Sequence, residues 1–279
     1  MTILQAIVLG LTQGATEFAP VSSSGHLILV PWLFNWSILN DPALNKTFDV
    51  ALHVGTLVGA IIYFRRDLWR YLKAWFHSVR WRSMSTPDER LAWALVIGTI
   101  PGAIAGMLLE STIEQRLGQP WIMVITFAVG GVVLWWVDAR SLQDRHLDSI
   151  GPRTGLGLGT LQALALQPGV SRSGITMTGG RWIGLDRESA ARFSFLLAIP
   201  IIAGAGLAKG VDLLQSGFQG YAGEFFWGFV ASAISGFVVI WGLLAYLRRH
   251  SFKVFMIYRL VVAGLIVVLI VTGARPATV

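Results

Sequence analysis

Cysteine is absent from the chain of 279 residues. Its absence excludes structural disulfides, thiolate catalysis and cysteine-ligated metals. Charge is also scarce, because only 13% of the residues are charged, whereas a soluble domain carries about 25%. The apolar residues lie in continuous runs of about 17 to 23 residues, as membrane-spanning helices require, and not in the alternating pattern of a membrane barrel. The composition therefore predicts an all-α integral membrane protein.

Six transmembrane helices are predicted, over residues 48–64, 91–109, 121–137, 190–208, 225–247 and 257–273. The net charge of +7 would also suit a protein that binds nucleic acid. The basic residues, however, lie in loops between the apolar runs. We therefore interpret them as topology signals that face anionic membrane lipids, and we expect no nucleic-acid partner.

The loops 65–90, 138–156 and 248–256 hold most of the lysine and arginine residues. By the positive-inside rule this side of the membrane is cytoplasmic, so both termini are predicted to be periplasmic. Arg181, Arg187 and Arg192 are interpreted as charges that flank the membrane on the cytoplasmic side.

Two apolar segments are interrupted by polar and helix-breaking residues. Residues 1–30 are broken between Glu17 and Gly25, and residues 157–186 are broken between Pro168 and Gly174. A polar turn at membrane depth is tolerated only where protein or a water-filled cavity surrounds it, and ionisable groups there are candidates for a functional site. We therefore predict two re-entrant helix pairs in addition to the six spans.

The two broken segments resemble each other at a spacing of 149 residues, which places Gln13 on Gln162 and Ser22 on Ser171. Each segment is followed by three spans. This order predicts a single membrane domain over residues 1–279 with an internal repeat, residues 1–137 and 157–273. Because three is an odd number, the second repeat would be inverted in the membrane, and inverted repeats place a site near the midplane.

The second turn has the residues of an anion site. Its small residues, which include Gly169 and Gly174, would let backbone N–H groups converge on a phosphate, and a helix beginning there would direct its N-terminus at the same point. Arg172 adds a planar, permanently charged fork that suits phosphate. Hydroxyl donors are Ser171, Ser173 and Thr176. The competing interpretation is a kinked helix pair that packs through small residues.

The first turn holds complementary groups. Glu17 is a candidate base or cation ligand, and His26 is a candidate to activate a serine or protonate a leaving group. The candidate nucleophiles are Ser22, Ser23 and Ser24. Alternatively, the serines cap helices and Glu17 pairs structurally with Arg172. His53 is interpreted as a packed histidine. Together the two turns favour phosphoryl transfer or hydrolysis, while a transporter of an anionic solute remains the competing class.

Two runs carry a resemblance to a known family: Gln13-x-x-x-Glu17 with Pro20-Val-Ser-Ser-Ser-Gly-His26, and Pro168-Gly-Val-Ser-Arg-Ser-Gly-Ile-Thr176. Over nearly its whole length the chain resembles the bacitracin-resistance family of undecaprenyl-diphosphate phosphatases. The resemblance implies a bacterial inner-membrane enzyme that converts undecaprenyl diphosphate to the monophosphate carrier lipid of peptidoglycan synthesis. It also implies a divalent cation, Mg²⁺ or Ca²⁺, and an active site accessible from the periplasm.

The resemblance assigns roles by position. Glu17, Ser23, His26 and Arg172 match the catalytic residues of the family. The proposed phosphate-binding set adds the hydroxyls and glycines named above, with Ser22 and Ser24 from the first turn. Gln13 stands where the family has Glu or Gln, so a metal would depend on Glu17, with Gln13 as a further candidate ligand. The nucleophile (Ser23, His26 or water), a flippase role for a polyprenyl phosphate, and a homodimer all stay open.

Overall fold

The computed structural model describes residues 1–36 and 42–278, and these residues are helical apart from short connections. The helices are α1 (Ile3–Glu17), α2 (Ser23–Phe34), α3 (Pro42–Trp81), α4 (Pro87–Leu117), α5 (Pro120–Arg140), α6 (Pro152–Ala163), α7 (Arg172–Trp182), α8 (Arg187–Ser216), α9 (Ala222–Leu247) and α10 (Lys253–Val271), with short 3-10 turns η1 (Leu147–Ser149) and η2 (Leu164–Leu166). The predicted all-α class is confirmed.

Six of the described helices, α3, α4, α5, α8, α9 and α10, are long and apolar enough to cross a membrane. Each of them contains one of the six predicted spans, except that the predicted residues 272 and 273 lie just beyond the end of α10. The chain is therefore a multi-pass helical membrane protein, as the length and hydropathy of its apolar runs indicated.

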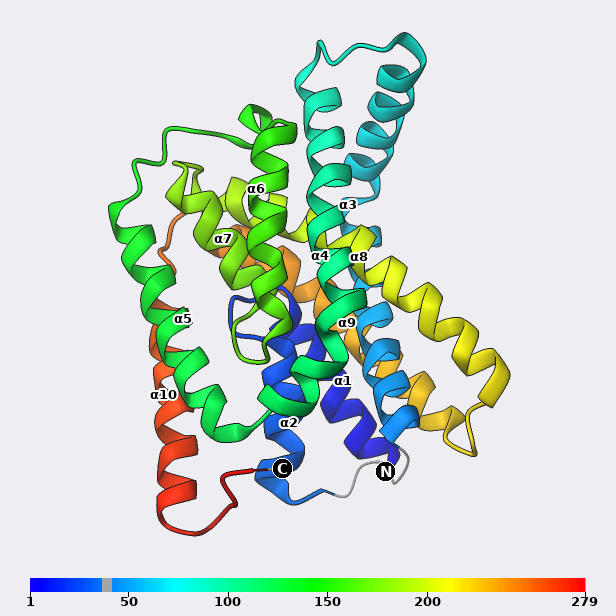
Figure 1. Cartoon of the computed structure of the whole chain (residues 1–279), viewed down its shortest axis with the longest axis vertical. Coiled ribbons are helices and arrows are strands. Elements are labelled where there is room, and N and C mark those ends of the chain that lie inside the picture. The colour runs from blue at the N-terminus through cyan, green and yellow to red at the C-terminus, as the bar shows by residue number, and fades with distance from the viewer. Residues whose placement is uncertain (37–41, 279) are drawn as a thin grey trace.

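The prediction of a basic loop over residues 65–90 is wrong. Helix α3 continues as far as Trp81, and α4 begins at Pro87, so the two helices project together beyond the rest of the bundle (Figure 1). Residues 65–81 contain no glycine or proline that would end a helix. Hydropathy marks where the apolar part of a helix ends, and a charged amphipathic segment continues the same helix into water.

The interpretation as a membrane-flanking charge is wrong for Arg181, while Arg187 and Arg192 are ion-paired and their cytoplasmic side stays a prediction. Arg181 is completely buried, and its Nε lies 2.7 Å from Oδ1 of Asp138 at the end of α5. Arg187 Nε lies 2.9 Å from the same atom. Arg192 pairs with Asp67 of α3 at 2.6 Å. Ion pairs of this kind link the ends of helices, because a buried charge requires a partner.

The helices α1 and α2 form one hairpin, and α6 and α7 form a second. The two hairpins extend into the bundle from opposite ends, and their turns meet in its interior (Figure 1). Close helix contact through glycines supports this arrangement, since a side chain at Gly159 of α6 would collide with the backbone of Gly98 on α4. The two breaks predicted from sequence thus lie side by side. Their re-entrant placement in a membrane and the inverted repeat stay predictions.

Candidate active site

The two turns share an unusual local conformation. Ser22 precedes α2 with φ 74° and ψ 98°, and Ser171 precedes α7 with φ 75° and ψ 113°. Each serine hydroxyl accepts a hydrogen bond from the backbone N–H of the glycine three residues later, Gly25 or Gly174. Positive φ angles are costly for residues other than glycine. Both helices therefore begin at the junction of the turns, where their N-terminal N–H groups provide positive electrostatic potential.

Glu17 is the centre of the polar cluster at this junction. Its side chain is 4% exposed, and Oε1 lies 2.7 Å from Nη2 of Arg172. The hydroxyl of Ser23 donates to Oε2 at 2.5 Å, and Nε2 of Gln13 donates to the same oxygen at 3.0 Å. Short hydrogen bonds to a carboxylate are characteristic of charge-assisted pairs. The structure therefore brings together four residues that the sequence assigned to the site from two distant segments.

His53 belongs to the same cluster, although sequence reasoning treated it as a packed histidine. Its Nε2 lies 3.5 Å from Oε2 of Glu17, and its Nδ1 donates to the backbone carbonyl of Asp49 at 2.8 Å. The carbonyl bond fixes the orientation of the ring toward Glu17. The available signal was an ionisable residue inside an apolar run, which is a functional candidate by default.

The described hydrogen bonds of His26 are made to Ser22 and Tyr258, not to the residues around Glu17. Its Nδ1 donates to the carbonyl of Ser22 at 2.7 Å. With the proton on Nδ1, Nε2 accepts from the hydroxyl of Tyr258, also at 2.7 Å. The ring stacks on Tyr258 and meets the edge of Phe127. Within the described residues, His26 thus connects α2 to α10 and makes no hydrogen bond to Glu17 or Ser23.

Two of the predicted phosphate-binding serines link the turns to each other, and others form hydrogen bonds within a turn or to α8. Ser22 accepts a hydrogen bond from the N–H of Gly169 at 3.0 Å, and Ser173 donates to the carbonyl of Ala19 at 2.9 Å. Further hydroxyl contacts join Ser171 to Ser173 (3.1 Å), Ser22 to Ser24 (3.4 Å) and Thr176 to Ser194 (2.6 Å). The hydrogen bonds of Ser22 and Ser173 therefore hold the two turns together, and Arg172 is the charged side chain among the predicted phosphate-binding residues.

Arg259 is the main residue that sequence reasoning missed. It lies near the start of the predicted span 257–273, and the structure buries it completely. Its guanidinium donates to backbone carbonyls of both turns and of α5. The partners are Pro20 (3.2 Å), Gly169 (2.8 Å), Val170 (3.2 Å), Thr126 (2.7 Å) and Phe127 (2.9 Å). An arginine in an apolar helix with no acidic residue of its own was the signal for a buried role.

Fold and cluster together define a class: a multi-pass helical membrane protein in which a carboxylate, a serine and an arginine meet between two broken helices. Residues 6–265 match the model of the family described as "Bacitracin resistance protein BacA". The chain belongs to this family.

Several relatives are similar to this chain over almost its whole length. The undecaprenyl-diphosphatase of Moorella thermoacetica is 47% identical over 267 residues, which make up 96% of this chain and 97% of that protein. The undecaprenyl-diphosphatase of Thermomicrobium roseum is 43% identical over 284 residues, with 99% and 100% covered. Undecaprenyl-diphosphatase 1 of Pseudoalteromonas translucida is 44% identical over 270 residues, with 96% and 99% covered.

Proposed function

We propose that this protein hydrolyses undecaprenyl diphosphate to undecaprenyl phosphate and inorganic phosphate, as a phosphatase that recycles the lipid carrier of cell-wall synthesis and thereby confers bacitracin resistance. The observation that carries the proposal is the hydrogen bond from Ser23 to a buried carboxylate that is also paired with Arg172. Phosphoryl transfer requires a nucleophilic hydroxyl next to a general base. It also requires a nearby cationic group, here an arginine, that stabilises the phosphoryl charge. Family membership supplies the substrate class.

The geometry favours Ser23 as the nucleophile over His26. Glu17 accepts the hydrogen bond of the Ser23 hydroxyl, so it is placed to take the proton as Ser23 Oγ attacks the terminal phosphorus. The bond from phosphorus to the bridging oxygen breaks, and the monophosphate lipid leaves. Water then attacks the phosphoserine, Glu17 assists again, and phosphate is released. His26 lacks a described contact with this pair, and its bond to Tyr258 favours an orienting role.

Arg172 stabilises the charge that develops on the phosphoryl oxygens. Its Nη2 is paired with Glu17 and its Nη1 donates to the carbonyl of Ser194 at 3.3 Å. These bonds hold the guanidinium before substrate binds and leave further N–H donors of the fork for phosphate. Preorganised donors lower the barrier because they need no reorganisation during the reaction.

The residues beside Glu17 fit a hard divalent cation. Oε1 of Gln13 is buried and has no hydrogen-bond partner among the described residues, and amide and carboxylate oxygens are the ligands that Mg²⁺ and Ca²⁺ prefer. The described residues contain no group of three histidine, aspartate or glutamate side chains that would form a complete cage. Glu17 and Gln13 would therefore hold Mg²⁺ or Ca²⁺ together with substrate oxygens and water. Such an ion would withdraw charge from the diphosphate.

The distribution of charge supports a placement in the cell. The lysine- and arginine-rich segments 65–90, 138–156 and 248–256 lie at one end of the bundle, and both termini lie toward the other end (Figure 1). The positive-inside rule places the basic end in the cytoplasm of a bacterial inner membrane and the termini in the periplasm. With this orientation we propose that the substrate reaches the site from the periplasmic side, where a spent diphosphate carrier would be recovered.

Purified protein in detergent, assayed for phosphate release from a polyprenyl diphosphate, tests the proposal. Removing one charge-stabilising donor lowers kcat by about 10²- to 10³-fold, so Arg172→Ala should lose at least this much. Glu17→Gln and Ser23→Ala should be comparably impaired. The matched control is Arg249→Ala, an exposed arginine at the basic end of the bundle, which should retain wild-type turnover.

The effects of these substitutions on turnover, together with trapping of a phosphorylated enzyme, distinguish the serine mechanism from a histidine nucleophile and the phosphatase from a transporter. Trapping of a phosphorylated enzyme should place phosphate on Ser23, and phosphate found on His26 instead would overturn the serine mechanism. A loss of tenfold or less in Arg172→Ala would mean that the phosphate is held elsewhere. Binding of polyprenyl diphosphate without turnover across Mg²⁺, Ca²⁺ and Mn²⁺ would replace the phosphatase with a transporter.

A further inference from the structure

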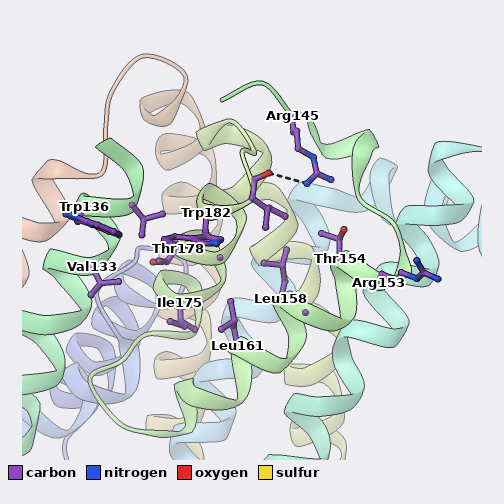
Figure 2. Close-up of a pocket in the computed structure, with 14 residues that line it drawn as sticks. Val133, Trp136, Arg145, Arg153, Thr154, Leu158, Leu161, Ile175, Thr178 and Trp182 are labelled. Atoms are coloured by element: carbon purple, nitrogen blue, oxygen red, sulfur yellow. Dashed lines mark hydrogen bonds between the residues drawn. The ribbon is translucent and has the colours of Figure 1, made fainter. Parts of the chain in front are cut away.

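A hollow that is not lined by the residues of the Glu17 cluster lies between helices α5, α6 and α7. It is a cavity of about 670 Å³, within the range of roughly 300–1,000 Å³ that holds small organic ligands. Its walls are apolar and come from all three helices, among them Val133, Leu158 and Ile175. Figure 2 shows these side chains directed into the space between the helices.

Two tryptophans form part of the wall. The rings of Trp136 on α5 and Trp182 on α7 stack with centroids 6.4 Å apart, and their side chains are partly exposed, 41% and 69%. Arg140 lies 4.6 Å above the Trp136 ring. Tryptophan beside arginine is typical of the level where hydrocarbon meets lipid headgroups, so the cavity spans the boundary between an apolar and a charged layer.

The charged part of the lining is entirely basic. Arg145 and Arg153 both line the cavity, and no described lining residue is acidic. Arg145 is held in place by donating to the carbonyl of Ile183 at 3.1 Å (Figure 2). Arg153 is exposed and has no hydrogen bond or ion pair with another described residue. The fixed guanidinium of Arg145 and the unpaired Arg153 at the edge of the cavity (Figure 2) complement a phosphate joined to a hydrocarbon chain.

We propose that this cavity binds an anionic phospholipid from the membrane leaflet at the basic end of the bundle, with its phosphate on Arg145 and Arg153 and one acyl chain between α5, α6 and α7. Basic pockets between membrane helices bind such headgroups, and anionic phospholipids surround the protein continuously. The site is separate from the proposed catalytic cluster, because none of Glu17, Ser23 and Arg172 lines the cavity. Bound lipid would brace α7, whose first residue is Arg172.

The chain offers a substitution that fills the cavity without disturbing the backbone. Gly157 lines the cavity, and a Cβ added there meets nothing within 4 Å. Gly157→Phe should therefore occupy the space of the acyl chain. Its matched control is Gly204→Phe in α8, where an added Cβ is equally free. Arg153→Ala removes one phosphate contact, and Arg249→Ala removes an exposed arginine outside the cavity.

The experiment is a native mass spectrometry titration of the full-length protein in detergent with phosphatidylglycerol and, separately, phosphatidylcholine. Each arginine near a headgroup contributes about 1 kcal/mol, or roughly fivefold in affinity. Phosphatidylglycerol should bind at least tenfold more tightly than phosphatidylcholine. Arg153→Ala should weaken phosphatidylglycerol about fivefold, and Gly157→Phe should abolish the tight site. Both control variants should bind as wild type.

Three results would overturn the proposal. Equal affinity for the two phospholipids would mean that the arginines do not select a headgroup. Unchanged binding in Gly157→Phe would place the lipid elsewhere. Displacement of phosphatidylglycerol by an equimolar polyprenyl phosphate would identify the occupant as the carrier lipid rather than a bilayer phospholipid. Because the readout is lipid binding, none of these results depends on phosphatase activity.

Discussion

Replacing Arg259 with methionine should destabilise the whole bundle, because this one side chain holds both turns. The guanidinium is completely buried and is surrounded by carbonyl groups from α5 and from the two turns. Methionine keeps an unbranched apolar stem but removes every donor. The carbonyls of Thr126 and Phe127 remain within a helix, whereas the three carbonyls of the turns have no other backbone donor among the described residues.

The expected magnitude follows from those three carbonyls. Leaving one buried polar group unsatisfied costs about 1–3 kcal/mol. Removing the buried charge of Arg259 offsets part of this destabilisation, because the folded protein no longer has to desolvate that charge, at several kcal/mol. We therefore expect a net loss of about 2–5 kcal/mol, at the upper end of single substitutions. At roughly 2–4 °C per kcal/mol, as measured for soluble domains, the melting temperature of Arg259→Met should fall by about 4–20 °C.

Thermal unfolding in detergent, followed by intrinsic tryptophan fluorescence, measures the effect. Arg259→Lys keeps the charge but offers three donors at a single point in place of the planar fork, so its melting temperature should lie between those of the wild type and Arg259→Met. Arg249→Met is the exposed control and should change stability by no more than about 0.5 kcal/mol. A melting temperature of Arg259→Met within about 1 °C of the wild type would refute the role of Arg259 as the link between the turns.

Two further predictions concern charge pairs. The hydrogen bond from His146 Nδ1 to Asp186 (2.7 Å) and the charge of that carboxylate raise the pKa of His146 above 6.5. The pair therefore stabilises the α5–α6 connection fully below pH 6.5 and loses this contribution as the pH rises through the raised pKa. An NMR titration should show the pKa of His146 returning toward 6.5 in Asp186→Asn; a wild-type pKa at or below 6.5 would contradict the contact. For Glu17 and Arg172, removing either partner strands a buried charge at a cost of about 3–5 kcal/mol. Glu17→Gln/Arg172→Met should therefore cost less than the sum of the single variants, by about 0.5–3 kcal/mol, and strictly additive losses in thermal unfolding would show that the pair is not coupled.

The sequence was sufficient to locate the spans and both turns. Long apolar runs identify helices that can cross a membrane, and the polar interruptions stand out against them. The contact between Glu17 and Arg172, which are 155 residues apart, could also be predicted from the sequence, because opposite charges in an apolar environment require partners. Helix ends were less accessible, since residues 65–81 continue α3 in water, where hydropathy no longer identifies the helix.

The sequence could not predict which serine of the first turn contacts Glu17 and which serines connect the two turns. Ser22, Ser23 and Ser24 are chemically identical, and only the backbone conformation decides which of them faces Glu17. That conformation depends on contacts with the other hairpin, such as the hydrogen bond from Gly169 to Ser22. The role of Arg259 is equally non-local, because its partners come from α5 and from both turns. Sequence spacing carries information along a helix, not across a tertiary contact.

The two turns require each other to reach their observed conformation. A serine with positive φ costs on the order of 1–3 kcal/mol, and both Ser22 and Ser171 carry this cost. Hydrogen bonds between the hairpins offset it, together with the donors of Arg259. Neither hairpin contains these partners by itself, so the geometry of the Glu17 cluster exists only when both hairpins and α10 have assembled. Substitutions of Ser22, Ser171 or Arg259 should consequently act mainly through stability, whereas those of Glu17, Ser23 and Arg172 should also lower kcat in protein that remains folded.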